Sequence, residues 1–189
     1  VKFHTTDYFK PSRDFNADDV LFTFQRLLDA NHPFRKAYPS ESPYFTDMGM
    51  NTTIKSVEKI DDQTVKFNLN NVDAAFVQNL AMSFASVQSA EYADQLLKQG
   101  KAEDINQKPI GTGPFVFKRY QKDAQIRYDG NTAYWKPEDV KLDHLIFSIS
   151  GDAAVRMQKL KAGECQVSGY PRPQDIEEMQ KDPNLKVIS

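Results

Sequence analysis

The sequence contains a single cysteine, Cys165, among its 189 residues. One cysteine excludes a disulfide within the chain and a cluster of thiolate ligands around a metal ion. The thiol is therefore either buried and unpaired or half of a bridge to a cysteine outside this sequence. The residues alone favour the unpaired thiol.

Motifs for catalysis and for metal or cofactor binding are also missing. The histidines are scattered, with no pair at a ligand spacing, so we expect no metal site; they are His4, His32 and His144. No Gly-x-Ser-x-Gly motif occurs, and nothing near Cys165 supports a nucleophilic thiol. Gly111 and Gly113 flank a threonine, but no third glycine follows, which argues against a dinucleotide site. We predict no catalytic residue, no metal and no cofactor.

Neither a long apolar run nor an excess of one charge is present. No stretch approaches the ~20 apolar residues of a membrane span, and no leader peptide is visible at Val1. The formal net charge is −2, so nothing suggests a surface that follows nucleic-acid phosphates. Apolar residues make up 40% of the chain and charged residues 26%, a balance that allows a buried core.

The elements that the sequence does contain are amphipathic. Phe15–Leu28 predicts a helix, because Asn16 is a good N-cap and apolar residues recur at helical spacing. A second helix is predicted between Ser89 and Gly100, where the glycine is a typical stop. Alternating polarity predicts β-hairpins at residues 54–70 and 115–128, and a short helix is expected at 74–80.

The stretch Pro109–Phe117 combines two glycines with two prolines, which predicts a shaped backbone turn that leads into a strand. Beyond it, a buried strand at 142–150, a helix at 152–163 and a strand at 164–167 would form a βαβ unit. A helix at 174–180 and a strand at 185–188 are expected to follow.

Residues 33–53 hold three prolines and several aromatic residues without a clear period. We interpret this segment as a long aromatic loop. Such loops are uncommon in compact domains and are often functional. The alternative is a loop whose rings simply pack onto the core.

Six motifs resemble, in the same order, motifs of the extracellular solute-binding proteins of ABC importers, in the branch that binds peptides. The resemblance covers essentially the whole chain, and it is specific because the motifs occur together. They are Val1–His4, Phe15–Phe24, Pro109–Phe115, Tyr134-Trp135, Ala162–Val167 and Tyr170–Pro173.

The resemblance implies an α/β fold of the periplasmic-binding-protein type, class II, with two lobes, an extra domain, and mixed sheets with packed helices. It also implies that the chain is an internal fragment. Residues 1–110 would be part of the extra α+β domain, and residues 111–189 a section of lobe one with the βαβ unit. Because that lobe would lack strands, we expect exposed apolar edges that need a partner or the rest of the chain.

The implied function is the capture of dipeptides or short peptides in the periplasm and their delivery to an ABC permease in the inner membrane. The full-length protein would be a monomer, made with a signal peptide that this fragment lacks, and neither nucleic acid nor an enzymatic reaction is expected. The alternatives are a relative that binds haem or antimicrobial peptides, and an interaction domain without a transport role.

Buried peptide termini need paired charges, and the resemblance places those partners in the second lobe, outside this chain. Within the chain, we select Ser42, Pro43, Tyr44 and Phe45 of the aromatic segment as candidate ligand-binding residues. A tyrosine can stack on a side chain and hydrogen-bond a backbone amide, although core packing is equally compatible with Tyr44. The resemblance also makes Cys165 half of a disulfide with a cysteine near the mature N-terminus, which suits an oxidising periplasm.

Overall fold

The helix predicted from Asn16 is present as α1 (Ala17–Leu28) in the computed structural model, which describes residues 1–188. The Asn16 side chain accepts a hydrogen bond from the Asp18 N–H at 3.0 Å, and the Asp19 carboxylate accepts one from the Asn16 N–H at 3.0 Å. This reciprocal cap pairs N–H groups that the first helical turn would leave without partners. Local sequence therefore sets where α1 begins.

The chain divides into two compact units. The first comprises Val1–Phe117 and Asp129–His144, and the second comprises Lys118–Tyr128 and the chain from Leu145 onward. The predicted division between residues 110 and 111 concerns domains of a longer protein, and it stays a prediction.

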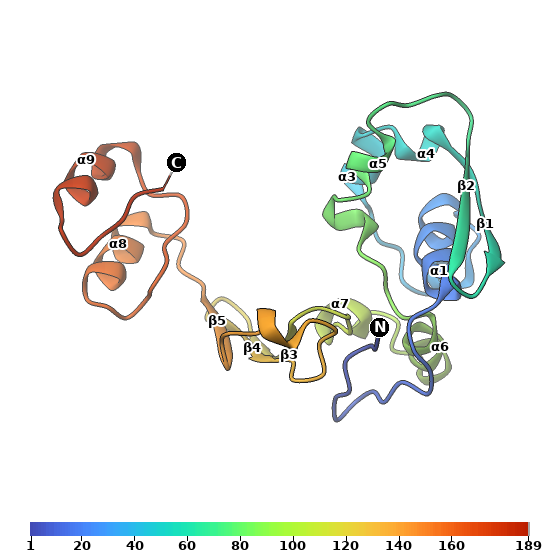
Figure 1. Ribbon diagram of the computed structural model, residues 1–189, viewed down its shortest axis with the longest axis horizontal. Helices are drawn as coiled ribbons and strands as arrows, with labels where there is room; N and C mark the ends of the chain where they lie inside the picture. The colour runs from blue at the N-terminus through green and yellow to red at the C-terminus, as the bar shows by residue number, and fades with distance from the viewer. Residues whose placement is uncertain (189) are drawn as a thin grey trace. The chain divides into compact units, whose positions relative to one another are not determined.

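In the first unit, α1 lies beside the hairpin of residues 54–69 (Figure 1). Its side chains contribute to two separate hydrophobic cores. Phe22 meets Phe34 edge-on at 5.4 Å between ring centroids, in a core shared with α6 (Ala90–Gln99) and α7 (Asp104–Gln107). Phe24 meets Phe67 edge-on at 4.9 Å, in the second core. The predicted helix from Ser89 to Gly100 is confirmed as α6. Ser89 caps α6, and Gly100 ends it with a left-handed φ of 66°.

Strands β1 (Ile54–Asp61) and β2 (Thr64–Leu69) form the first predicted hairpin. They pair antiparallel, with Val57 opposite Phe67. The Phe67 ring lies 5.5 Å from that of Phe76 on α5 (Phe76–Asn79) as well as against Phe24. One face of the hairpin is thereby buried beside α1, as the alternating polarity indicates.

The prediction of a loop at residues 33–53 is wrong. The segment folds as three short helices, α2 (Pro33–Ala37), α3 (Pro43–Asp47) and α4 (Met50–Thr53). Proline stands first in α2 and α3, where its preset φ suits a helix and its missing N–H costs nothing. Each helix buries one large side chain, Phe34, Phe45 or Met50. A single turn has too few residues to show a helical period.

The second predicted hairpin is confirmed as β3 (Phe115–Gln121) and β4 (Gln125–Gly130), which form a sheet in the order β3-β4-β5 with β5 (His144–Ser148). The Gly130 N–H donates to the Asp143 carbonyl at one end of β4, and the Ile149 N–H donates to the Ala124 carbonyl at the other, so β4 and β5 run antiparallel. β5 was expected to be buried, but Ile146 and Phe147 are 51% and 52% exposed. This exposure confirms the expectation of exposed apolar side chains at a sheet edge, because β5 is an edge strand of the sheet. That the sheet lacks strands stays a prediction.

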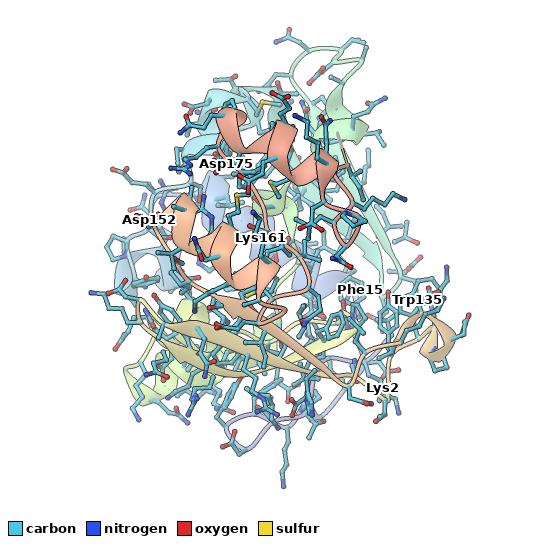
Figure 2. The ribbon with its side chains drawn as sticks, turned by 90° about the vertical axis from the view of Figure 1, so that its left-hand side faces the viewer. Lys2, Phe15, Trp135, Asp152, Lys161 and Asp175 are labelled. Carbon is cyan, nitrogen blue, oxygen red and sulfur yellow. The ribbon has the colours of Figure 1, made fainter. Side chains whose placement is uncertain are left out.

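The second unit contains α8 (Ala153–Lys161) and α9 (Pro173–Lys181), both predicted. Figure 2 labels Asp152, which caps α8, and Lys161 at the end of α8, whose ammonium pairs with Glu178 of α9. Two short helical turns at Ser83–Ala85 and Pro137–Asp139 complete the regular elements in the first unit. Within residues 1–188, no helix has the length and apolar character needed to cross a bilayer.

The predicted βαβ unit is not formed, because residues 164–167 are not a strand in the described chain, and the separate strand predicted at 185–188 is not formed either. A strand needs a neighbour for its backbone hydrogen bonds, and none is present beside these residues within the described chain. The N–H groups of Glu164 and Cys165 instead donate to the Lys159 carbonyl at the end of α8, at 2.9 and 3.4 Å. Gly163, with φ of 73°, makes this helix ending possible.

Candidate functional site

The candidate segment Ser42–Phe45 begins α3 and divides its side chains between solvent and core. Tyr44 is 63% exposed, whereas Phe45 is 1% exposed. The Phe45 N–H donates to the Ser42 carbonyl at 3.0 Å, and the Met48 N–H donates to the Tyr44 carbonyl at 3.1 Å. The Tyr44 ring is therefore exposed to solvent on a hydrogen-bonded helical turn.

Phe45 anchors this turn. Its ring meets that of Phe84 at 5.6 Å between centroids, and it belongs to the second core with Phe24 and Met50. Pro43 is exposed and Ser42 is partly exposed. A role for these four residues in ligand binding stays a prediction, in which Phe45 would hold the turn and Tyr44 would meet the ligand.

A small cavity lies against the same turn and has a volume of about 30 Å³. Its lining combines two arginines with hydroxyl and aromatic side chains: Arg26, Leu27, Phe34, Arg35, Tyr38, Ser40, Ser42, Phe45 and Thr46. Pockets for drug-sized ligands measure roughly 300–1,000 Å³. This cavity is therefore too small to enclose a dipeptide.

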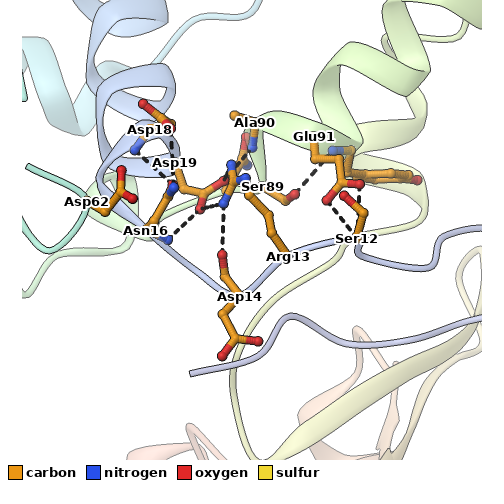
Figure 3. Close-up of polar contacts among 12 residues, drawn as sticks. Ser12, Arg13, Asp14, Asn16, Asp18, Asp19, Asp62, Ser89, Ala90 and Glu91 are labelled. Atoms are coloured by element: carbon orange, nitrogen blue, oxygen red, sulfur yellow. Dashed lines mark hydrogen bonds and ion pairs between the residues drawn. The ribbon is translucent and has the colours of Figure 1, made fainter.

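A charged network in the first unit surrounds Asp19 (Figure 3). The Asp19 side chain is 0% exposed. Its carboxylate accepts two hydrogen bonds from the Arg13 guanidinium, at 2.8 and 3.0 Å, and one from the Ala90 N–H at 2.9 Å. It also accepts the Asn16 N–H, so its oxygens are well supplied with donors. Asp19 thus links the N-terminus of α1 to the N-terminus of α6. Because its carboxylate oxygens already accept these hydrogen bonds, we do not assign it to the binding of a peptide ammonium group.

The turn at Gly111–Gly113 is held by two side chains from other parts of the first unit. The His4 Nε2–H donates to the Gly113 carbonyl at 2.9 Å, and the Asn131 amide donates to the same carbonyl at 3.0 Å. The Gly111 N–H points to His4 Nδ1 at 3.4 Å. Burial lowers the pKa of His4, which fits a neutral ring that donates at one nitrogen and accepts at the other. These contacts fix a backbone path, as the glycine spacing indicates.

Cys165 follows α8 in the second unit, where it is partly exposed and carries a free thiol. Its assignment to a disulfide stays a prediction. Across residues 1–188, no three His, Cys, Asp or Glu side chains are grouped as metal ligands would be.

Sequence reasoning overlooked Arg26 and Arg35, which share the small cavity although they lie on different helices. Pro33 was the one sequence signal that could have indicated their proximity, because a proline starts α2 only a few residues after α1 ends. A tight connection of this kind folds the second arginine back towards the last turn of α1, where the Arg35 Nη1–H donates to the Leu27 carbonyl at 2.9 Å.

Comparison with known proteins decides the family. Residues 1–189 match the family of bacterial extracellular solute-binding proteins, family 5, middle region. The chain belongs to this family.

Two curated members of the solute-binding family illustrate its range. Di/tripeptide-binding protein 1 of Pseudomonas aeruginosa (strain UCBPP-PA14) is 71% identical over 189 residues, which cover 100% of this chain and 35% of the relative. Heme-binding protein A of Haemophilus influenzae is 48% identical over 188 residues, which cover 100% of this chain and 34% of the relative. The chain thus spans about a third of the length of these curated relatives.

A solved member of the same fold type is the dipeptide-binding protein from Pseudoalteromonas sp. SM9913 in complex with Met-Leu. It is similar to this chain with a TM-score of 0.91 and 37% identity, covering 97% of this chain and 36% of that one. The predicted fold class, part of an α/β periplasmic-binding-protein-like fold, is confirmed, and the described residues form two small sheets with packed helices.

Proposed function

We propose that this solute-binding chain is a section of the substrate-binding component of an ABC importer. The whole protein would capture dipeptides or short peptides in the periplasm and deliver them to a membrane permease. The observation that carries the proposal is the 71% identity to a di/tripeptide-binding protein along the entire chain. The similarity to a protein solved with the dipeptide Met-Leu supports the same ligand class.

Tyr44 is the residue of this chain that we assign to ligand contact. Its ring is exposed, its turn is anchored by buried Phe45, and its hydroxyl has no hydrogen-bond partner among the described residues. An aromatic ring with a free hydroxyl can stack on a peptide side chain and also pair with a peptide backbone group. Ser42 and Pro43 complete the surface beside it.

Calorimetry of the full gene product with a panel of dipeptides tests both parts of the proposal. We expect saturable heats, and we expect Tyr44→Ala to weaken binding about thirtyfold, because stacking and a hydrogen bond each contribute roughly 1 kcal/mol. Tyr44→Phe separates the hydroxyl from the ring. Met48→Ala, a change at an exposed side chain at the end of the same helix, is the matched control and should bind as the unmodified protein does. Unchanged affinity in Tyr44→Ala would remove Tyr44 from the site without affecting the transport role.

Haem binding is the second candidate function, because Heme-binding protein A is 48% identical to this chain. Haem absorbance titrations of the same preparation distinguish the two. Haem binding with no heat from any dipeptide would replace the first proposal. The absence of binding to either ligand class would favour an interaction domain instead.

We also assign Cys165 to a disulfide with a cysteine outside this chain, in keeping with an oxidising periplasm. Thiol labelling of the full gene product without reductant, read by mass spectrometry, should leave Cys165 unmodified. Complete labelling of Cys165 in the native, unreduced protein would contradict this assignment.

A further inference from the structure

The small cavity beside α3 carries positive charge that no acidic side chain in its lining balances. It lies between the last turn of α1, the helix α2 and the start of α3, and its polar lining consists of two arginines, a tyrosine and three hydroxyl residues. Its volume of about 30 Å³ exceeds the ~10–15 Å³ that one water molecule needs, so it can hold a molecule of a few heavy atoms.

Arg26 is the decisive side chain. Its Nε is buried and has no hydrogen-bond partner within residues 1–188, and the guanidinium forms no ion pair there. Burial lowers the pKa of Arg26, and no neighbouring carboxylate counteracts the loss of hydration. The Arg26 guanidinium lies over the Phe22 ring, with its central carbon 5.9 Å from the ring centroid. A partly buried guanidinium with an unpaired, buried Nε–H is costly, because charged groups leave water readily only when they are paired.

Arg35 brings a second guanidinium to the same space. One of its Nη1–H groups is used by the Leu27 carbonyl at 2.9 Å, which holds the side chain in place. A guanidinium has five N–H donors in a planar fork, so most of the Arg35 donors stay available to a ligand. The hydroxyls of Ser40 and Ser42 add neutral donors to the lining. The Thr46 hydroxyl donates to the Pro43 carbonyl at 2.9 Å.

We propose that this cavity binds one small oxyanion or carboxylate group, held between Arg26 and Arg35. Two arginine forks and several hydroxyls match the planar, multi-oxygen geometry of such a group better than they match a cation or an apolar molecule. The occupant would be a free anion or the carboxylate of an acidic ligand. The proposal does not depend on peptide capture, because it is carried by the lining residues alone.

A purely structural role for Arg26 makes a different prediction. Arg26 lies in the last turn of α1, where a positive charge is favourable near the helix carbonyls. In that case its replacement would lower stability by the same amount at every anion concentration. If Arg26 binds an anion, the stability difference between the unmodified protein and the variant must grow as the anion is added.

The test is a thermal unfolding titration of the full gene product with sodium formate, at ionic strength held constant by a bulky sulfonate salt. We expect a saturable rise in Tm for the unmodified protein. Arg26→Gln should raise the apparent Kd at least about tenfold, because it removes charge-assisted hydrogen bonds. Lys36→Gln removes one exposed positive charge next to Arg35 without touching the cavity, and should titrate as the unmodified protein does. Equal, unsaturated shifts in all three proteins would overturn the proposal.

Two further measurements keep the proposal testable if Arg26→Gln does not fold. Arg35→Lys retains the charge but loses the fork, and we expect about tenfold weaker formate binding. NMR of arginine Nε–H groups in the unmodified protein should show a signal of Arg26 that moves and saturates with formate. An unmoved Arg26 signal would overturn the proposal. Parallel titrations with Ala-Glu and Ala-Gln identify the source: a response to Ala-Glu at Arg26 that Ala-Gln does not give indicates a peptide side chain, and a response to formate alone indicates a free anion.

Discussion

The two compact units differ in where they keep their apolar side chains. In the first unit, aromatic and aliphatic residues fill two cores, both of which include residues of α1. In the second unit, Met157 and Met179 are the only buried apolar side chains among the described residues. Many of its large apolar side chains are exposed, namely Tyr120, Ile146, Phe147, Ile149, Val155, Val167, Tyr170 and Ile188.

This difference indicates that stability is distributed unevenly along the chain. Burial of apolar surface is the main favourable term in folding, and regions with little of it open at low free energy. We therefore expect the first unit to hold its structure through contacts within the chain. The second unit should depend on apolar cover from outside the described residues, as exposed patches of this kind commonly do.

The largest expected effect comes from a matched pair of phenylalanines. Phe24→Ala should lower the free energy of unfolding by about 3–5 kcal/mol, because Phe24 is 2% exposed and its loss leaves a cavity beside Phe67. Phe147→Ala removes the same atoms from a ring that is 52% exposed, and should cost less than half as much. Urea unfolding of the 189-residue chain, followed by circular dichroism, measures both.

Equal losses of unfolding free energy in Phe24→Ala and Phe147→Ala would show that apolar burial does not stabilise the first unit more than the second. The same pair in the full gene product sharpens the comparison. A larger cost of Phe147→Ala there than in the 189-residue chain would mean that residues outside this chain cover β5.

A smaller effect is expected from two arginine–aspartate pairs, one in each unit. Arg13 binds Asp19 and Arg172 binds Asp175, each through two hydrogen bonds of 2.8–3.0 Å. Asp19 also accepts backbone N–H groups from the starts of α1 and α6, so Asp19→Asn should cost about 2–3 kcal/mol. Asp175→Asn should cost less, because the Arg172 side chain is 43% exposed and solvent can replace the pair.

Urea unfolding midpoints of the two asparagine variants, compared at matched salt, check this ranking. High salt should reduce the effect of Asp175→Asn more than that of Asp19→Asn. The reverse order of losses would place the more important ion pair in the second unit and contradict the comparison.

The sequence predicted the elements whose signals are local. Asn16 and Ser89 cap α1 and α6, and Gly100 ends α6, at the positions where the sequence placed these signals. Strand partners cannot be read from local sequence, which is why residues 164–167 were predicted as a strand, although the N–H groups of Glu164 and Cys165 donate to the Lys159 carbonyl of α8. The one-turn helices α2 to α4 were missed because each buries a single side chain and shows no period.

The candidate site was only partly predictable for the same reason. The sequence singled out the segment around Tyr44 from its aromatic content, but it could not tell exposed Tyr44 from buried Phe45, since both rings are chemically similar. Arg26 and Arg35 were missed because their meeting depends on how α2 turns back from α1. The partners of His4 lie more than 100 positions away in the sequence, so no local pattern could reveal them.

The smallest expected effect is a loss of stability in mild acid that is confined to the first unit. Burial lowers the pKa of His4 and of His32 below the ordinary value of 6.5. His32 accepts the Phe34 N–H at its Nδ1, and His4 faces the Gly111 N–H in the same way. Because the unfolded chain takes up protons first, this stability is complete above about pH 6.5 and falls as the pH drops below that value.

Urea unfolding between pH 7.5 and pH 5.5 measures the loss, and His4→Gln isolates the contribution of one ring. Glutamine can donate and accept hydrogen bonds without titrating. The free energy of unfolding of His4→Gln should therefore fall less over this range than that of the unmodified chain. His144 also belongs to the first unit, which leaves the second without a histidine, so amide exchange in α8 and α9 should not accelerate through this titration. Acceleration in those helices that His4→Gln suppresses would show that the acid response of the first unit reaches the second, and that the two do not behave independently.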